Sequence, residues 1–234
     1  MAYPFFYINH FDEKATVFTL DEVNSKHIVQ VLRMQNGEKL HLTDGKGHLI
    51  VAEIQENHKK HCVVKWVQSD FIAQKNKVNI AISPIKNNSR FEWFLEKATE
   101  IGIHNIFPII TQRTEKANFK WERFQSILVS AMLQSQQRWL PILHQPISYE
   151  NFIKENTQSD FEKLIAHCVD GDKKTIPLSN AERLILIGPE GDFTVDEIDL
   201  ALQHHFNPVT LGETRLRTET AAVTATVLLN HLSI

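Results

Sequence analysis

The stretch Ile185-Leu186-Ile187-Gly188-Pro189-Glu190-Gly191-Asp192-Phe193-Thr194 runs from an apolar segment through a turn into the start of a helix. Residues 183–187 predict a buried strand, and Thr194 with Glu197 forms a capping-box pattern that opens a helix ending near Gln203. In an α/β sheet, ligands bind outside the carboxyl ends of the strands, where such turns lie. The turn therefore predicts a ligand site, although an ordinary strand-to-helix connection would show the same pattern.

A second stretch repeats this arrangement, because Leu211-Gly212-Glu213-Thr214-Arg215-Leu216-Arg217-Thr218-Glu219-Thr220-Ala221 follows a predicted strand at 209–211. Thr218 can cap the helix predicted over 218–232, and Glu219 suits the positive end of its dipole. Two arginines with hydroxyls and a carboxylate are more polarity than a connector needs, although a salt-bridged loop over a helix end would look similar. Since both loops follow strands, we expect a pocket between them.

Strands and helices alternate around these two loops. Gly102 is a predicted C-cap for one of the helices. This alternation predicts an α/β layer with a mainly parallel sheet. The further strands are predicted at 78–83, 106–110 and 163–167, and the further helices at 90–101 and 122–137.

The N-terminal residues show a different pattern, with short segments rich in β-formers separated by turn residues. This pattern predicts a small β-barrel with one helix at 21–34. The polar join at 74–77 is the best domain boundary, so the predicted domains are 1–72 and 77–234. The strands of the barrel are predicted at 4–8, 38–43, 48–54 and 62–67.

The composition is that of a globular protein with a real core. The chain has 234 residues, of which 42% are hydrophobic and 23% are charged. No apolar run is long enough to cross a bilayer and the N-terminus has no signal-peptide pattern, so we expect no membrane association. Two cysteines cannot form a disulfide framework, which favours the reducing cytoplasm. His58, His61 and Cys62 lack a partner cluster, so no metal site is predicted.

Charge is distributed unevenly along the chain. The net charge is −3, but residues 71–140 hold 10 Lys and Arg against 5 Asp and Glu. A local surplus of this size is consistent with a face that contacts phosphates, but on this signal alone a solvated face that binds nothing is the favoured interpretation. Neither loop matches a dinucleotide-binding or P-loop pattern, which ranks a nucleotide hydrolase last.

Five segments, taken in order, resemble the motifs of a known family. They are residues 27–33 with Gly37, residues 97–103, Gln134-Ser135 with Arg138 and Pro141, and the two loops described above. Together they resemble the RsmE family of SPOUT-class methyltransferases, which methylate N3 of a uridine in 16S ribosomal RNA of the small ribosomal subunit. The resemblance covers nearly the whole chain.

The resemblance implies a fold and partners that composition could not suggest. The fold would be α/β, with a SPOUT-type domain containing a C-terminal trefoil knot, preceded by a small PUA-like β-barrel that binds RNA. Knots are rare among folds in general. The protein would be a homodimer that uses S-adenosyl-L-methionine as its cofactor. The small apolar residues of the last predicted helix are compatible with a dimer interface and equally with an ordinary buried helix.

The resemblance also implies roles for particular residues. Arg217 is the first choice for binding the uracil anion or a flanking phosphate, and Glu219 would orient Arg217 or accept the proton. The implied cofactor-binding residues are Ile187, Gly188, Pro189, Glu190, Gly191, Leu211, Gly212, Leu216, Arg217, Thr218, Glu219, Thr220, Ala221 and Ala222. The candidate RNA-binding residues are Arg33, Lys97 and Arg138, by family position, and Lys86, Arg90 and Arg113, by charge alone.

The chain departs from the family pattern at two places. The family has a second glycine where this chain has Asp192, and a left-handed backbone there would strain Asp more than Gly. The acidic residue that the family has after the strand at 163–166 is replaced by His167-Cys168, and no role is assigned to that segment. The rival functions are another SPOUT methylation, on a ribose 2′-oxygen or another base position, and a non-catalytic RNA-binding protein.

Overall fold

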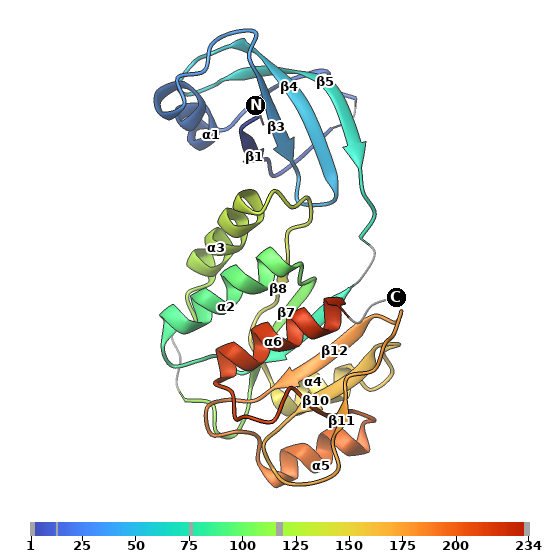
Figure 1. Ribbon diagram of the computed structural model, residues 1–234. Helices are drawn as coiled ribbons and strands as arrows, with labels where there is room; N and C mark the ends of the chain where they lie inside the picture. Colours follow the sequence, from blue (N-terminus) through green and yellow to red (C-terminus); the bar gives the residue numbers. More distant parts are fainter. Residues whose placement is uncertain (1–2, 13, 75–76, 116–118, 232–234) are drawn as a thin grey trace. The chain divides into compact units, whose positions relative to one another are not determined.

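The computed structural model describes residues 3–12, 14–74, 77–115 and 119–231 (Figure 1). The chain divides into two compact units. The N-terminal unit consists of Met1–Gln74 and Met132–Leu140, and the C-terminal unit of Lys75–Ala131 and Pro141–Ile234.

A five-stranded sheet of order β1-β3-β4-β5-β2 forms the N-terminal unit. β1 pairs with β3 in parallel, and the other neighbours are antiparallel. The family-implied PUA-like sheet is thus present, and it includes the short strand β2, which the sequence analysis did not identify. The strands are β1 (Phe5–Tyr7), β2 (Val17–Thr19), β3 (Lys39–Thr43), β4 (His48–Glu56) and β5 (Val63–Phe71).

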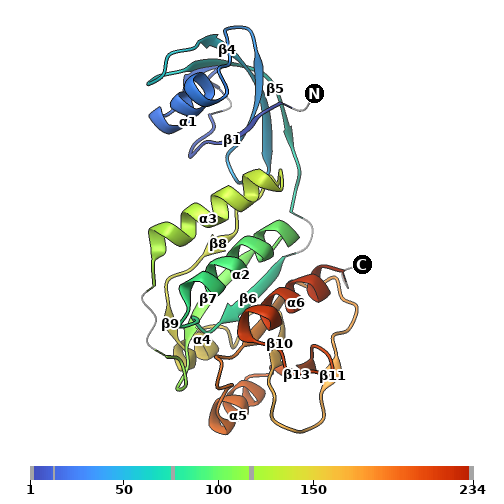
Figure 2. The ribbon, with the colours of Figure 1, turned by 60° about the vertical axis from the view of Figure 1, so that its left-hand side comes forward.

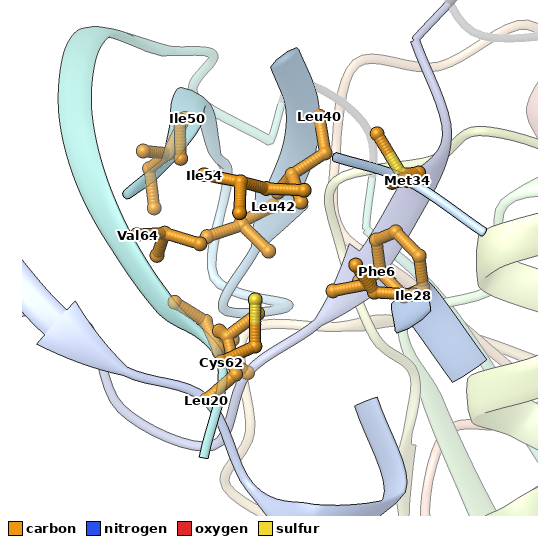
Figure 3. Packing of buried hydrophobic residues seen from close by; sticks show 12 residues of the cluster. Phe6, Leu20, Ile28, Met34, Leu40, Leu42, Ile50, Ile54, Cys62 and Val64 are labelled. Carbon is orange, nitrogen blue, oxygen red and sulfur yellow. The ribbon is translucent and has the colours of Figure 1, made fainter. Parts of the chain in front are cut away.

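Alternate residues of these strands build a separate core (Figure 3). Leu40 and Leu42 of β3 face Ile50 and Ile54 of β4, and all four are fully buried. This period of two is what a sheet with one buried face requires.

The single helix predicted at 21–34 is wrong in its second half. Helix α1 (Glu22–Lys26) begins at Asp21, whose side chain accepts from the backbone N–H of Asn24. It continues as a π-helix, η1 (His27–Val31), which ends before Arg33 adopts a left-handed backbone with φ of 56°. An extra residue in a helical turn widens it, and such turns are frequent at functional sites.

A parallel sheet of order β11-β13-β10-β12-β6-β7-β8 forms the centre of the C-terminal unit, and β9 also pairs with β7. All of its ladders are parallel. The central strands β6 and β12 are buried at every residue, as parallel strands covered on both faces are. The strands are β6 (Val78–Ile82), β7 (Asn105–Ile110), β8 (Ile142–Leu143), β9 (Ile147–Ser148), β10 (Glu162–Ala166), β11 (Lys174–Thr175), β12 (Arg183–Ile187) and β13 (Asn207–Thr210).

The helices confirm two cap predictions, whereas Thr218, the predicted cap of α6, is instead its first helical residue. The capping box of Thr194 and Glu197 is present at α5, and Gly102 caps α2 with a φ of 102°. Helix α4 follows β9 and was not predicted. Helix α3 ends at Gln134, before the predicted end at Gln137. The helices are α2 (Asn88–Ile101), α3 (Trp121–Gln134), α4 (Tyr149–Glu155), α5 (Val195–Gln203) and α6 (Thr218–His231).

Helix α6 returns to the middle of the sheet although it follows β13, which lies two positions from β12 and three from β6 in the strand order (Figure 2). It packs against α2, β6 and β12. This return is consistent with the trefoil knot implied by the family resemblance. Leu232, the predicted end of the helix, lies outside the described residues. Among the described residues, no helix is both long and apolar enough to span a membrane.

Candidate functional site

A cavity of about 690 Å³ lies at the carboxyl ends of β10, β12 and β13. Because these strands are parallel neighbours, their exit loops meet at one edge of the sheet. The expected pocket between the two loops is therefore present. Its lining consists of residues 166–168, 187–190 and 209–218, together with Asp170, Lys173, Asp192 and Ala221.

Gly188 begins the first loop, and the structure explains why it is a glycine. A Cβ atom there would lie 3.1 Å from the ring of Phe193, which is buried in the core of the C-terminal unit. The absence of a side chain therefore lets Phe193 pack under the loop.

Asp192 has the left-handed backbone that the sequence analysis considered, with a φ of 62°. Its carboxylate accepts from the backbone N–H of Phe193 at 2.8 Å and from that of Cys168 at 2.7 Å. Asp tolerates this conformation better than most residues because its side chain can bond to the nearby backbone. The strain expected at this position is thus accompanied by two hydrogen bonds that glycine could not make.

The second loop turns at Gly212, where φ is 140°. Thr210 braces the turn, because its hydroxyl accepts from the Gly212 N–H at 3.2 Å and donates to the Gly212 carbonyl at 2.9 Å. The loop ends where the Ala221 N–H donates to the Arg217 carbonyl at 2.7 Å, which opens α6. Within the described residues, the exposed Arg217 side chain has no hydrogen-bond or ion-pair partner, so it is available to a ligand.

The two predicted catalytic residues have different surroundings. Arg217 lines the cavity, whereas Glu219 does not. Glu219 is 6% exposed, and its Oε1 lies 3.6 Å from Nε of Arg90 on α2. Its Oε2 is buried and has no hydrogen-bond partner in the described part of the chain. Residues two apart in a helical turn do not face the same way, which explains the separation.

The structure brings most of the predicted cofactor-binding residues together. Four of the predicted residues are absent from the lining: Gly191, Glu219, Thr220 and Ala222. A Cβ atom at Gly191 would instead meet Arg113, and Ala222 is buried within α6. The ten that line the cavity are Ile187, Gly188, Pro189, Glu190, Leu211, Gly212, Leu216, Arg217, Thr218 and Ala221.

The loop after β10, residues 167–173, is a wall of the cavity to which the sequence analysis assigned no role. His167, Cys168, Asp170 and Lys173 line it. Burial, followed by the nearby Lys173 ammonium, lowers the pKa of His167 below its ordinary value. Nδ1 of His167 is buried and has no hydrogen-bond partner among the described residues. The signal available in the sequence was only that this loop, too, follows a buried strand.

Most of the candidate RNA-binding cations in the C-terminal unit have acidic partners. Lys86 lies 2.6 Å from Glu115, and Lys97 lies 2.7 Å from Glu96. Arg90 pairs with Glu219, as described above. Arg113 has a different role, because it donates to the Gly191 carbonyl at 2.7 Å and so holds the first loop.

The other two candidate RNA-binding residues belong to the N-terminal unit. Arg138 donates to Asp70 at 2.6 Å and lowers the pKa of that carboxyl through this hydrogen bond. Arg33 is exposed and follows η1. In the described part of the chain, its guanidinium has no ion-pair partner. No group of three or more potential metal ligands is found among the described residues.

Two family models match the chain. Residues 73–230 match a model described as an RNA methyltransferase domain, and residues 20–65 match one described as an RNA methyltransferase PUA domain. The first covers the strands and helices that surround the cavity, and the second covers most of the N-terminal sheet.

Individual relatives agree with the family models. The chain is 30% identical over 233 residues to ribosomal RNA small subunit methyltransferase E of Synechocystis, covering 94% of this chain and 74% of that protein. A probable rRNA-methyltransferase from Porphyromonas gingivalis has a TM-score of 0.90 at 36% identity, with 98% of both chains covered. The Neisseria gonorrhoeae ribosomal RNA small subunit methyltransferase E bound to S-adenosyl methionine has a TM-score of 0.85 at 27% identity, covering 99% and 98% of the chains.

Proposed function

Because this chain belongs to the ribosomal RNA small subunit methyltransferase E family, we propose that it transfers a methyl group from S-adenosyl-L-methionine to N3 of a uridine in 16S ribosomal RNA. The observation that supports this most directly is the single cavity joining the 187–190 loop to the 209–218 loop. In the proposed division of labour, residues 1–72 bind RNA and residues 77–234 bind the methyl donor and catalyse transfer.

The cavity fits the methyl donor in size and chemistry. Its volume of about 690 Å³ lies in the range of cofactor pockets. Apolar groups such as Ile187 and Leu216 offer surfaces for an adenine ring, and the exposed backbone at Gly212 can approach closely because no Cβ intervenes. Charged groups on the same lining, including Glu213 and Arg215, suit the polar end of the molecule.

When bound, S-adenosyl-L-methionine supplies an electrophilic methyl group on a positive sulfur. The residues of this chain must hold the acceptor base in line with that methyl and exclude water. Uracil N3 reacts as its anion, so the site needs a positive group near the base and a proton acceptor. We assign the first task to Arg217, whose side chain lies at the cavity and has no partner among the residues that the structure describes. Two exposed carboxylates of the lining, Glu190 and Glu213, are proton acceptors within the same site.

Glu219 takes a positioning role in this proposal, because it lies outside the cavity lining. Its buried carboxylate sits in the first turn of α6 and pairs with Arg90 of α2. That pairing ties the start of α6, and with it Arg217, to the neighbouring helix.

The proposal extends to a homodimer acting in the cytoplasm, where its ribosomal substrate is found. Trp93 of α2 and Val227 of α6 are 43% and 44% exposed, on two helices that pack together. A contiguous exposed apolar patch is typical of an interface, and these two side chains are our candidates for one. Light scattering after size-exclusion chromatography should give twice the mass of 27.0 kDa.

Methyl transfer is tested by incubating the purified protein with S-adenosyl-L-methionine and either free 16S ribosomal RNA or small ribosomal subunits. Digestion to nucleosides and mass analysis should then give N3-methyluridine. A methyl group on the ribose or on another base position would reject the N3 assignment. Absence of donor binding in calorimetry would support the non-catalytic RNA-binding alternative instead.

A further inference from the structure

The loop of residues 167–173 lies beside the first loop and is tied to it by one side chain. Asp192 belongs to the first loop, and its Oδ2 accepts from the Cys168 N–H, 24 residues away along the chain, at 2.7 Å. Asp192 and Cys168 both line the cavity. The hydrogen bond therefore joins two walls of the same pocket.

The first loop does not depend on this hydrogen bond for its own shape. Arg113 donates to its Gly191 carbonyl, Phe193 is buried beneath it, and Thr194 caps the following helix. The Asp192 N–H also closes a turn with the Pro189 carbonyl at 2.9 Å. The first loop is thus held without the hydrogen bond to Cys168, and the main effect of this bond is on the position of the 167–173 loop.

The other contacts of the 167–173 loop are few. Most of its residues are exposed, and Gly171 has a φ of 152° with nothing near its missing Cβ atom. An exposed loop with few packed side chains opens easily. A charge-assisted hydrogen bond to a backbone N–H at its start therefore has a large influence on where the loop lies.

The position of this loop matters to a ligand because of His167. Its side chain lines the cavity together with Cys168, Asp170 and Lys173 of the same loop. A shift of the loop would therefore move this wall relative to a bound ligand. His167 directly precedes Cys168, so the clamp at the Cys168 N–H fixes the backbone next to this ring.

We propose that Asp192 is a positioning residue that clamps the 167–173 loop as a wall of the methyl-donor cavity and so holds the His167 side chain beside the bound donor. This inference rests on the proposed function, since it takes the donor as the ligand. Where the resembling family has a glycine, this chain accepts a left-handed Asp and gains a link between two walls.

The clamp itself is tested without any ligand, by amide hydrogen exchange of the full chain. Asp192→Gly suits the left-handed backbone and removes both acceptors, so the Cys168 N–H should exchange at least about 10-fold faster at unchanged overall fold. Asp192→Asn keeps one acceptor oxygen and should give an intermediate rate. Asp199→Asn, an exposed charge removal on α5, is the matched control and should leave the Cys168 rate unchanged. An unchanged rate in Asp192→Gly would overturn the clamp.

The consequence for the ligand is tested by calorimetry with S-adenosyl-L-methionine and by steady-state kinetics. Asp192→Gly should weaken donor binding about 10-fold and raise the donor KM, while kcat changes by less than a factor of about three. His167→Phe, which replaces the ring on this wall by a larger apolar one, should weaken binding to a similar degree.

The outcomes separate the two proposals. Wild-type donor affinity in both Asp192→Gly and His167→Phe would overturn the positioning role even if the clamp exists. Failure of the wild-type protein to bind the donor would instead reject the proposed function, and the exchange experiment would still decide whether Asp192 holds the loop.

Discussion

Arg217 is the residue on which the proposed chemistry depends most. It lines the cavity, is exposed, and has no protein partner within the described residues, so its removal disturbs little of the fold. Arg217→Ala should lower turnover by about 100-fold or more, the scale seen when one preorganised charge-stabilising donor is lost. Arg217→Lys keeps the positive charge but lacks the planar guanidinium group. Its turnover should fall between that of the wild type and that of Arg217→Ala. Turnover by Arg217→Ala close to that of the wild type would remove Arg217 from the mechanism.

Gly188 offers a stability test at the same loop. A Cβ atom in Gly188→Ala would meet the buried Phe193 ring at 3.1 Å and the Phe193 backbone nitrogen at 3.2 Å. Since neither can move freely, we expect a loss of about 1–3 kcal/mol in the free energy of unfolding, as for other overpacked sites. Urea denaturation measures it. Gly37→Ala is a useful contrast. A Cβ atom at Gly37 would meet nothing within 4 Å, but φ is 86°, so this variant tests backbone strain without a steric clash.

At the residue scale, the sequence alone predicted the two principal loops but not their third neighbour. The glycines, the capping box and the doubled arginine are local patterns. The role of His167 depends on β10 lying between β12 and β13, which is a property of strand order and not of residues near His167 in sequence. The separation of Arg217 from Glu219 could have been anticipated, because residues two apart in a helix face different ways.

At the element scale, Arg183 of β12 links α6 to the sheet. Its guanidinium is buried and donates to the carbonyls of Leu229 at 2.8 Å and Pro177 at 3.1 Å. The Leu229 carbonyl lies in the last described turn of α6. Arg183→Met removes these buried hydrogen bonds and should reduce the free energy of unfolding by about 3 kcal/mol or more.

Arg123→Met is a matched control for Arg183→Met. Arg123 is exposed and pairs with Glu92 at the surface, so its loss should have little effect on stability. Thermal and urea denaturation of the two variants should therefore differ clearly. Equal, small effects would show that the Arg183 contacts do not anchor α6.

Elements with strong local signals were predicted well, and those defined by distant partners were not. β12 and α5 agree with their predicted ranges because an apolar run and a capping box mark their ends. β2 is only three residues long and pairs with β5, more than 40 residues away, so no local pattern identifies it. The predicted helix at 21–34 changes to η1 where branched residues such as Ile28 and Val29 reach the core.

At the scale of the whole molecule, the net charge is −3, so RNA binding must depend on a local basic surface. We expect RNA affinity to fall steeply as salt rises, because Arg33 and the basic middle segment would release counterions on contact with phosphates. Arg33→Ala should reduce the slope of log K against log salt by about one unit. Filter binding or anisotropy at several salt concentrations measures it. A flat response would exclude the basic segment as the RNA face.

Three half-buried histidines make the free energy of unfolding depend on pH. Burial is the main cause that lowers the pKa of His104, His144 and His167 in the folded protein. The unfolded chain, with histidine pKa values of about 6.5, binds more protons below neutrality. The contribution of these histidines to the free energy of unfolding should therefore be complete above about pH 6.5. It should decline as the pH falls toward 5.

His144→Gln isolates one contribution to this pH dependence. Nε2 of His144 lies 2.8 Å from Oδ1 of Asn105, which is an acceptor because Nδ2 of Asn105 donates to Asn79. Gln can donate to the same oxygen but does not titrate. The variant should show a shallower decline in stability between pH 7 and 5, whatever its stability at pH 7. An identical slope would exclude His144 as a contributor.

The return of α6 to the centre of the sheet has a consequence for the protein during its own synthesis. Arg217, Thr218 and Ala221 complete the cavity, and the Leu229 carbonyl is the partner of the buried Arg183. A nascent chain still attached to a ribosome cannot close this pocket until residue 229 has emerged from the exit tunnel. An enzyme that modifies ribosomal RNA would thus acquire its methyl donor only after its last described helix has folded back onto the sheet.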